Sequence, residues 1–563
     1  MNKVRKYLIG LLSISLIGGL IFINSTKVLK KTSKADFSQD AFKIEKCNYN
    51  STRDTIISMK KGKYSINRTN DLYEAKDENH GYWTFLIYLS GNEDESKNGV
   101  CSGILDNIVS ASTKAGEKVK FIVATGGTSK WKKGDDAPFK LNRKLIQFYE
   151  VCNGNVSTVK TDDNKDFVID AVAKGNDKMY VTSMGNPDVL NTFISMGVNK
   201  YRTTTVEVEE AIEDKDFSDV LEEKKSKKKD SDNTDEENTE DETKKKENKK
   251  TKIVERTYNN HIGLFIYGNN DVMDKGVAYD ANCKDYLTFS ELELALNASK
   301  GAMGNKFDLV CFDGTTSQYV EMANMLVPYA EYLVGPQCKG GYSGVKYDII
   351  AEDIGLGYSK TAYEVASNIC ETSYLASNVA VKKKVVLSAI NLKNMDAFLY
   401  RLNSTLSKLN KMIETKPEEF TKYSLLMNKA AATSKNSVDM GNFLRKIGPK
   451  INGISYTYSN YNRLIANKVS AIRYGENKNC TGLSVYWNMK ATDADYEIIK
   501  NNSVNPYLLN IMDASMYISN KSNLEQYNIN RKKWEEAKDY YSRDNKYIGV
   551  VTNGRIEDKQ NSK

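Results

Sequence analysis

Few side chains in this sequence could carry nucleophilic or metal chemistry. The 563 residues include only two histidines, His80 and His261. They also include eight cysteines, none of them in a Cys-x-x-Cys pair: Cys47, Cys101, Cys152, Cys283, Cys311, Cys338, Cys370 and Cys480. This spacing indicates neither a zinc site nor a redox motif, and the cysteines are too sparse for a disulfide framework. One or two disulfides are compatible with the sequence, with their pairing left open, and thiol catalysis would need a histidine beside a cysteine.

The elements that must position such residues are apolar strands alternating with helices. Buried strands are predicted at residues 83–89, 118–125, 262–267, 307–312 and 332–334, and helices at residues 102–115, 188–198 and 317–329. The pair Asn153-Gly154 predicts a hairpin between residues 145–151 and 156–160. Short apolar strands separated by helices indicate an α/β fold whose mostly parallel sheet is covered on both faces.

The pattern changes after Cys370. Strands are predicted at residues 385–390 and 482–487, and helices at residues 396–413 and 534–541. This half is expected to be α+β, and it either completes the same sheet or packs beside it.

The N-terminus has the features of an export segment. Residues 1–6 are basic, and residues 7–26 are uncharged and mostly apolar, so we expect a signal peptide or signal-anchor helix over residues 1–33. Its cleavage is left open, and a buried core helix is the weaker alternative. The rest of the protein should lie outside the membrane, either secreted or on the extracellular face of the cell membrane. Residues 34–78 are polar and are expected to form an irregular stalk.

Charge argues against one class of partner and marks an insert. The net charge of +8 is small for this length, and no nucleic-acid recognition motif is present. Residues 222–252 contain no aliphatic or aromatic side chain, and their charges come in blocks. We therefore expect a disordered insert at residues 203–257, either a tolerated solvated loop or a binding element.

Several segments, in their order and spacing, point to one family. They are residues 82–92 (YWTFLIYLSGN), 184–190 (MGNPDVL), 276–280 (GVAYD), 285–292 (DYLTFSEL), 307–313 (FDLVCFD), 437–439 (SVD) and 482–486 (GLSVY). Together they resemble the clostripain family of caspase-like cysteine peptidases over roughly residues 80–490. The resemblance implies a caspase-like α/β/α sandwich over residues 79–375, interrupted by the insert, with residues 376–563 as a C-terminal α+β extension.

The resemblance also implies peptide hydrolysis after a basic residue by a cysteine and a histidine. In the family each follows the carboxyl end of a parallel strand, where open α/β sheets place their sites. Here the histidine position is Asn269 and the cysteine position is Thr315. An asparagine cannot act as a general base, and a threonine hydroxyl is a poor nucleophile without one.

The remaining histidines and the nearest cysteine do not replace this dyad. His261 begins the third strand, so it lies about 26 Å from Asn269 if the strand is extended. His80 precedes the first strand and should lie at the same amino edge. Cys311 lies within the fourth strand and should be buried and inert.

Other family features are partly kept. Asp313 matches an aspartate that helps to line the pocket for a basic residue, although it could equally cap the following helix. Gln337 and Lys339 stand where the family has carboxylates, which weakens the prediction of such a pocket. Lys275 lies where some members have a processing cut, and without a dyad no self-cleavage is expected. No cofactor is expected, except that Asn92-Glu93-Asp94-Glu95 could offer oxygen ligands to calcium.

Three functions compete. The first is a pseudo-peptidase, an extracellular binding or scaffolding module for a peptide or protein ligand. The second is an active peptidase of the family that cuts after arginine or lysine with a non-standard site, for example by a mechanism that uses Thr315 or a carboxylate. The third is a surface protein that works through its charged insert. None involves nucleic acid, and membrane attachment would come only from an uncleaved N-terminal helix.

Overall fold

The structure is a computed structural model. It describes residues 46–52, 54–60, 63–68, 72–74, 81–133, 138–160, 166–170, 182–211, 251–339, 342–359, 361–377, 385–448, 451–470, 479–489, 502–519, 551–552 and 555–556. The predicted export segment, His80 and the predicted helix 534–541 lie outside the described residues. No helix within the described ranges is both long and apolar enough to cross a membrane.

A mixed sheet forms the centre of the molecule. Among the described residues its order is β19-β16-β15-β14-β11-β4-β5-β6-β7, with β8 paired to β6. The strands are β4 (Trp83–Ser90), β5 (Val119–Gly126), β6 (Leu145–Cys152), β7 (Asn155–Thr158), β8 (Val168–Asp170), β11 (His261–Tyr267), β14 (Phe307–Asp313), β15 (Ala330–Lys339), β16 (Val385–Asn391) and β19 (Ile465–Ser470). The central strands from β15 to β5 run parallel, and the strands at both edges are antiparallel. The predicted strands and the mostly parallel core are confirmed.

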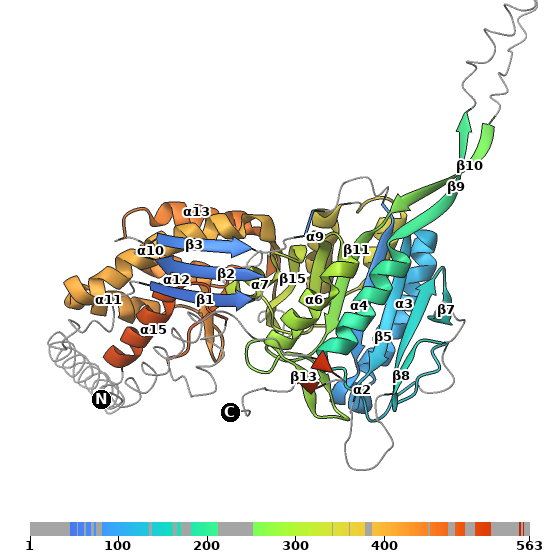
Figure 1. Cartoon of the computed structure of the whole chain (residues 1–563), viewed down its shortest axis with the longest axis horizontal. Helices are drawn as coiled ribbons and strands as arrows, with labels where there is room; N and C mark the ends of the chain where they lie inside the picture. Colours follow the sequence, from blue (N-terminus) through green and yellow to red (C-terminus); the bar gives the residue numbers. More distant parts are fainter. Residues whose placement is uncertain are drawn as a thin grey trace, which may run out of the picture.

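Helices cover both faces of this sheet (Figure 1). One face packs against α4 (Pro187–Tyr201) and α6 (Phe289–Met303). The other face packs against α3 (Val100–Ala115), α8 (Tyr347–Gly355) and α9 (Ala362–Ala376). Strands β4 and β14 are buried at every residue, as expected of strands covered on two sides. The α/β/α sandwich is therefore the observed fold.

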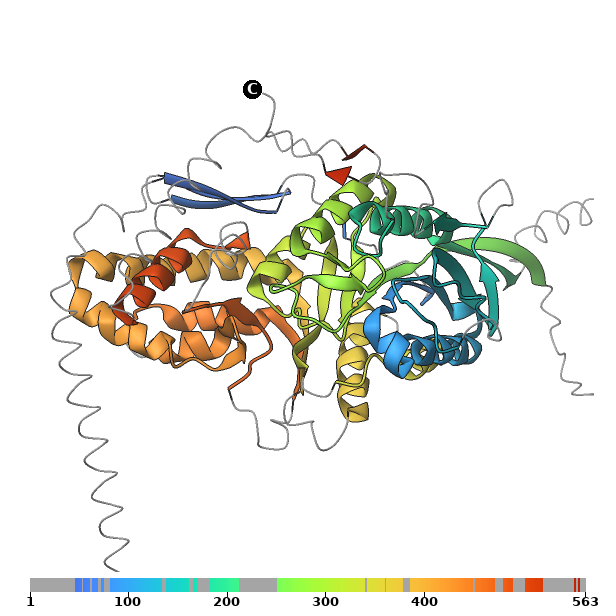
Figure 2. The same ribbon diagram turned by 90° about the horizontal axis from the view of Figure 1, so that it is seen from below.

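The C-terminal half both extends the central sheet and packs beside it, so each of the two alternatives left open by the sequence is partly right. Strands β16 and β19 extend the sheet, while the other elements form a helical lobe beside it (Figure 2). The lobe contains α10 (Met395–Thr415), α11 (Pro417–Met427), α12 (Met440–Ile447), α13 (Ile454–Leu464), α15 (Pro506–Ser519) and a small sheet of β17 (Ala432–Ser434), β18 (Ser437–Asp439) and β20 (Ser484–Tyr486). The strand predicted at residues 482–487 therefore belongs to the lobe.

Residues 46–68 do not form an irregular stalk, which corrects the prediction for this part of residues 34–78. They form an antiparallel sheet of β1 (Lys46–Thr52), β2 (Thr55–Lys60) and β3 (Lys63–Arg68). Tyr64 is buried and donates to the Val504 carbonyl, and Arg68 pairs with Asp396 at 2.5 Å. The few apolar residues of this segment thus pack on the C-terminal lobe (Figure 2).

The ends of the predicted disordered insert are also ordered. Strands β9 (Thr203–Ala211) and β10 (Thr251–Asn259) form an antiparallel ribbon that projects from the sandwich (Figure 1). Residues 212–250 lie outside the described residues. The expectation of disorder at residues 203–257 is therefore wrong for the two arms of the ribbon.

Shorter elements complete the chain. Helix α7 is confined to Val320–Leu326, so the helix predicted from residue 317 starts later. The others are α2 (Asn92–Asn98), β12 (Val277–Asp280), β13 (Asp285–Leu287), β21 (Val551–Thr552), β22 (Arg555–Ile556) and the short 3-10 helices at Gly116–Lys118 and Leu392–Asn394.

Candidate functional site

The carboxyl ends of β11 and β14 meet closely because each is followed by a glycine. Gly268 donates to the Asp313 carbonyl at 3.0 Å. Gly314 has a φ of +89°, and a β-carbon there would lie 2.4 Å from the Gly268 carbonyl oxygen. A β-carbon on Gly268 would in turn lie 2.4 Å from the Thr315 hydroxyl. The structure therefore brings the segments that carry Asn269 and Thr315 together at one edge of the sheet.

Asn269 is exposed at this edge. Its side-chain amide donates to the carboxylate of Asp94 on α2, the helix that follows β4. The side chain of Asn269, predicted to lie at a catalytic position, is thus held by a neighbouring acidic group. An amide in this position can donate a hydrogen bond to a carbonyl oxygen, but it cannot take a proton from a nucleophile.

Thr315 is fully buried, and its hydroxyl has no hydrogen-bond partner among the described residues. The loop after Thr315 contains further buried polar atoms without a hydrogen-bond partner among the described residues, namely the Ser317 hydroxyl and both amide atoms of Gln318. Asn270 adds an unpaired buried amide nitrogen from the end of β11. Buried polar atoms are normally paired, so this group of atoms calls for ordered water or a bound polar group.

Asp313 faces the segment before α8. Its carboxylate accepts from the Val345 backbone N–H at 3.0 Å and from the Tyr347 hydroxyl at 3.2 Å. Burial raises the pKa of this carboxyl, and hydrogen bonds from Val345, Tyr342 and Tyr347 oppose the rise. Asp313 does not cap α7, whose N-cap residue is Tyr319. Both carboxylate oxygens are used by the protein itself, so a basic side chain would have to displace these donors.

His261, the one histidine among the described residues, lies at the opposite edge of the sheet. Its Nδ1 hydrogen-bonds Asp308 Oδ1 at 2.5 Å, and its ring stacks on Trp83 at 4.5 Å between centroids. The ring is buried at the amino end of β11, opposite the end that Asn269 follows. Cys311 is buried within β14, and burial raises the pKa of its thiol well above the usual value.

One thiol near the site was missed by sequence reasoning. Cys101 begins α3, and its Sγ lies 3.8 Å from the carbonyl oxygen of Ser90, at the end of β4. Burial raises the pKa of the Cys101 thiol well above normal, and the charges of Glu95, Asp313 and Asp94 raise it further. The thiol is therefore held in its protonated, unreactive form. Its position follows from the packing of α2 and α3 under the sheet edge, and no motif marks it.

Gln337 is held against the C-terminal lobe by its side-chain amide. Its amide donates to Asp439 Oδ2 at 2.8 Å and to the Ser484 hydroxyl at 3.2 Å, and it accepts from the Gly482 N–H at 2.9 Å. Asp439 also accepts from the Thr481 backbone at 2.5 Å. This arrangement ties the end of β15 to β18 and β20 and leaves the amide no free donor or acceptor.

The carboxylates of residues 93–95, which could offer oxygen ligands to calcium, have partners within the protein. The Glu95 carboxylate accepts from the Ser102 N–H, the Ser102 hydroxyl and the Lys132 N–H, at 2.6–2.9 Å. Glu93 pairs with Lys97 at 2.6 Å, and Asp94 holds Asn269. Within the described ranges, no group of three His, Cys, Asp or Glu residues is placed to hold a metal ion.

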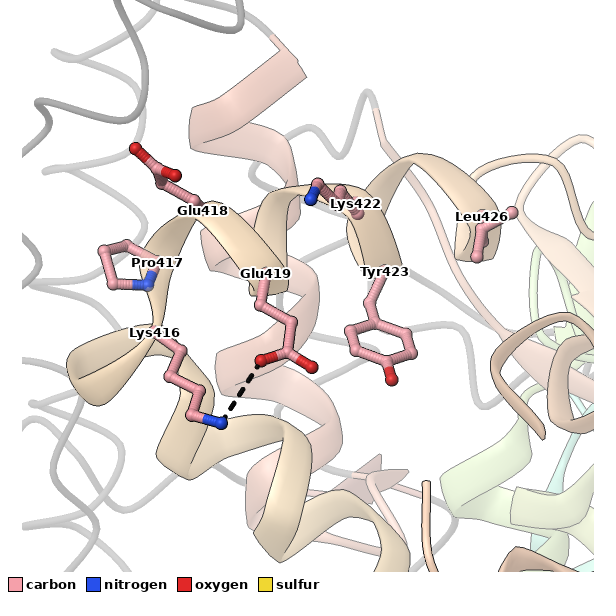
Figure 3. A pocket seen from close by; sticks show the side chains of 7 residues that line it. All are labelled: Lys416, Pro417, Glu418, Glu419, Lys422, Tyr423 and Leu426. Carbon is pink, nitrogen blue, oxygen red and sulfur yellow. Dashed lines mark ion pairs between the residues drawn. The ribbon is translucent and has the colours of Figure 1, made fainter. Parts of the chain in front are cut away.

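A pocket of about 460 Å³ lies far from this edge, along α11 in the lobe (Figure 3). Every residue that lines it comes from one stretch of chain: Lys416, Pro417, Glu418, Glu419, Lys422, Tyr423 and Leu426. Lys416, the first residue of this stretch, pairs with Glu419 at 3.5 Å. Such a surface brings no groups together from different elements, so it is not a candidate for catalysis.

The sequence model of the clostripain family matches residues 206–545. No curated protein matches the chain. Among solved structures, a secreted C11 cysteine protease from Bacteroides thetaiotaomicron in complex with an irreversible peptide inhibitor is 12% identical, with a TM-score of 0.44 over 77% of this chain and 99% of that chain. An inactive zymogen C11 protease from Parabacteroides distasonis is 10% identical, with a TM-score of 0.43 over 77% of this chain and 98% of that chain. Because the family's sequence model spans more than half of its length, the chain belongs to the clostripain family.

Proposed function

We propose that this chain is a clostripain-family protein without peptidase activity, which serves as a binding or scaffolding module outside the cell. The observation that carries the proposal is the chemistry of the two strand ends. At the positions that the family resemblance assigns to the catalytic cysteine and histidine, the chain carries the buried hydroxyl of Thr315 and the exposed amide of Asn269. No base hydrogen-bonds that hydroxyl among the described residues. A threonine without a base to take its proton does not attack a peptide bond at a useful rate.

A role in binding is favoured by the polar atoms that the same edge leaves unpaired. Thr315, Ser317, Gln318 and Asn270 present donors and acceptors of the kinds that a peptide backbone uses. They are reached only if the loop after β14 shifts, because Thr315, Ser317 and Gln318 are completely covered. The proposed ligand is a peptide or protein segment. Recognition of its arginine or lysine through Asp313 is not part of the proposal, because Val345 and Tyr347 already use that carboxylate.

A location outside the cell is the second part of the proposal. It is supported by the basic start and the uncharged apolar run of residues 1–26. Labelling intact cells with a reagent that does not cross membranes would modify the protein if this is right. Protection of the protein until the cells are lysed would contradict it.

The activity test compares the purified full chain with an active clostripain-family peptidase on arginyl and lysyl reporter peptides. The chain is expected to show no turnover above that of buffer, and Thr315→Ala should leave this result unchanged. The same peptides, with the scissile bond made non-hydrolysable, are then titrated for binding. Turnover that disappears on thiol alkylation or in Thr315→Ala would overturn the proposal.

A further inference from the structure

Two cysteines from distant parts of the chain lie side by side next to the site. Cys338 lies at the β-bulge near the end of β15, and Cys480 lies shortly before β20. Their chain neighbours are held at one point, because Gln337 and Thr481 both donate to Asp439 Oδ2, at 2.8 and 2.5 Å. The Cys480 thiol lies close enough to the Cys338 thiol to raise its pKa. Because their chain neighbours share one acceptor, the fold holds Cys338 and Cys480 close together.

The two thiols differ in access to solvent. Cys338 is partly exposed, whereas Cys480 is only 4% exposed. The sulfur of Cys338 also lies 3.8 Å from the Thr433 carbonyl oxygen, and the Cys480 carbonyl accepts from Lys468 at 3.1 Å. An accessible thiol backed by a buried one is the arrangement that thiol–disulfide exchange needs. Cys311 and Cys370 also lie near each other, but both are buried, so an oxidant cannot reach them.

We propose that Cys338 and Cys480, both thiols in this structure, form a disulfide when the protein meets a disulfide-bearing oxidant. The Cys338 thiolate attacks one sulfur of the oxidant and releases the other sulfur as a thiolate. The Cys480 thiolate then attacks the Cys338 sulfur of the mixed disulfide and releases the second thiolate of the oxidant. Two electrons pass to the oxidant, and the two protons from the protein thiols protonate its released thiolates, so the oxidant becomes two thiols.

The surroundings favour a slowly formed and stable bond. The adjacent Cys480 thiol, burial and the nearby Asp439 all raise the pKa of the Cys338 thiol. Few thiolates are then present at neutral pH, so exchange is slow and speeds up as the pH rises. The same surroundings do not stabilise the thiolate form, so the equilibrium favours the disulfide. This suits a structural or regulatory bond and not a catalytic one.

The disulfide would join two segments that border the candidate site, the end of β15 and the segment before β20. Cys338 lies next to Gln337, and Cys480 lies close to Ser484, whose N–H donates to the Gln318 carbonyl at 2.7 Å. Gln318 belongs to the loop of unpaired polar atoms after β14. Oxidation would therefore restrict the movement of β20 against this loop, which ligand entry requires. This inference concerns the redox state of the chain and stands whether or not the proposed binding role does.

The test starts from the full chain incubated with oxidised glutathione at pH 8. After alkylation and digestion without reductant, mass spectrometry should find the peptides of Cys338 and Cys480 linked. Because the bond joins residues about 140 positions apart, its reduction should lower the Tm by about 5 °C. Cys480→Ser should remove the response of the Tm to reductant. Cys152→Ser, which changes another partly exposed thiol, should keep it.

Two results would overturn the proposal. The first is recovery of Cys338 and Cys480 as separately alkylated thiols after oxidation, with a Tm that does not respond to reductant. The second is a linkage of either cysteine to a different partner in most of the protein.

Discussion

The two ends of β11 and β14 carry buried polar groups of opposite character. At the amino edge, His261 and Asp308 are paired at 2.5 Å, and Asp308 also accepts from the Ile262 N–H at 2.7 Å. At the carboxyl edge, the hydroxyl of Thr315 is buried and has no partner in the described part of the chain. The His261–Asp308 pair is satisfied, as expected of a stable core, and the amino edge leaves only Trp83 Nε1 and Asn260 Oδ1 unpaired among the described residues, whereas the carboxyl edge gathers a larger group of unpaired polar atoms. This contrast fits the proposal that the fold keeps the shape of the site while its catalytic residue types have changed.

The largest effect is expected at the amino edge. Asp308→Ala leaves His261 and the Ile262 N–H buried without their acceptor, so the free energy of unfolding should fall by about 3 kcal/mol. Chemical denaturation at pH 7 measures the change. Asp106→Ala, which removes an exposed carboxylate paired with Lys133, is the matched control and should change little. Equal effects of the two substitutions would contradict the claim that the buried pair at the amino edge stabilises the fold.

A second test concerns a buried acid behind the carboxyl edge. Burial raises the pKa of Glu321 on α7 to about 7, opposed by hydrogen bonds from its own N–H and that of Tyr486. Between pH 4.5 and 7 the folded chain then holds a proton that the unfolded chain has released, so stability falls as the pH rises through this range and is level above it. Glu321→Gln should remove about 3 kcal/mol of this loss.

Denaturation curves at pH 5, 6, 7 and 8 test this expectation. The free energy of unfolding of Glu321→Gln should gain on that of the wild type as the pH rises. The exposed Glu117→Gln is the control and should run parallel to the wild type. A Glu321→Gln curve that also runs parallel would show that the buried carboxyl titrates normally.

The smallest effect on stability has the opposite sign. Thr315→Val keeps the shape of the side chain and removes an unpaired buried hydroxyl, so it should stabilise the protein by about 1 kcal/mol. A thermal melt with and without a bound peptide measures it. Destabilisation instead would mean that the hydroxyl has a partner, such as an ordered water, and would weaken the contrast between the edges.

Much of the sheet could be predicted from the sequence, because central parallel strands are buried on both faces and appear as continuous apolar runs. Strands β4, β5, β11 and β14 follow this rule. Asn186-Pro187 marks the start of α4, where the Asn186 side chain accepts from the Asp188 N–H. The hairpin at Asn153-Gly154 follows from positive φ values of 47° and 75° at these residues.

The elements that were mispredicted depend on contacts between distant segments. The sheet of β1–β3 is polar, and its few buried side chains, Ile57, Met59 and Tyr64, gain their cover from the C-terminal lobe. Helix α7 starts late because the backbone of Thr316 and Ser317 pairs with Asn270 and Pro336. Neither contact leaves a periodic signal in the local sequence.

The candidate site was also predicted only in part. Asn269 and Thr315 were identified from the family motif, and the structure brings their strand ends together. The partner of Asn269, Asp94, and the buried thiol of Cys101 come from the end of a third strand, so only the sheet order reveals them. The engagement of Asp313 with Val345 was also not foreseeable, because it depends on how the segment before α8 crosses the sheet edge.

Hydrolysis of a lysyl or arginyl peptide by the purified chain is the most direct measurement. It should be followed over hours, with reductant present and with the Thr315→Ala variant run in parallel. We predict that both proteins release product no faster than buffer. Release by the wild type that Thr315→Ala abolishes would contradict the account, because it would make Thr315 a working nucleophile.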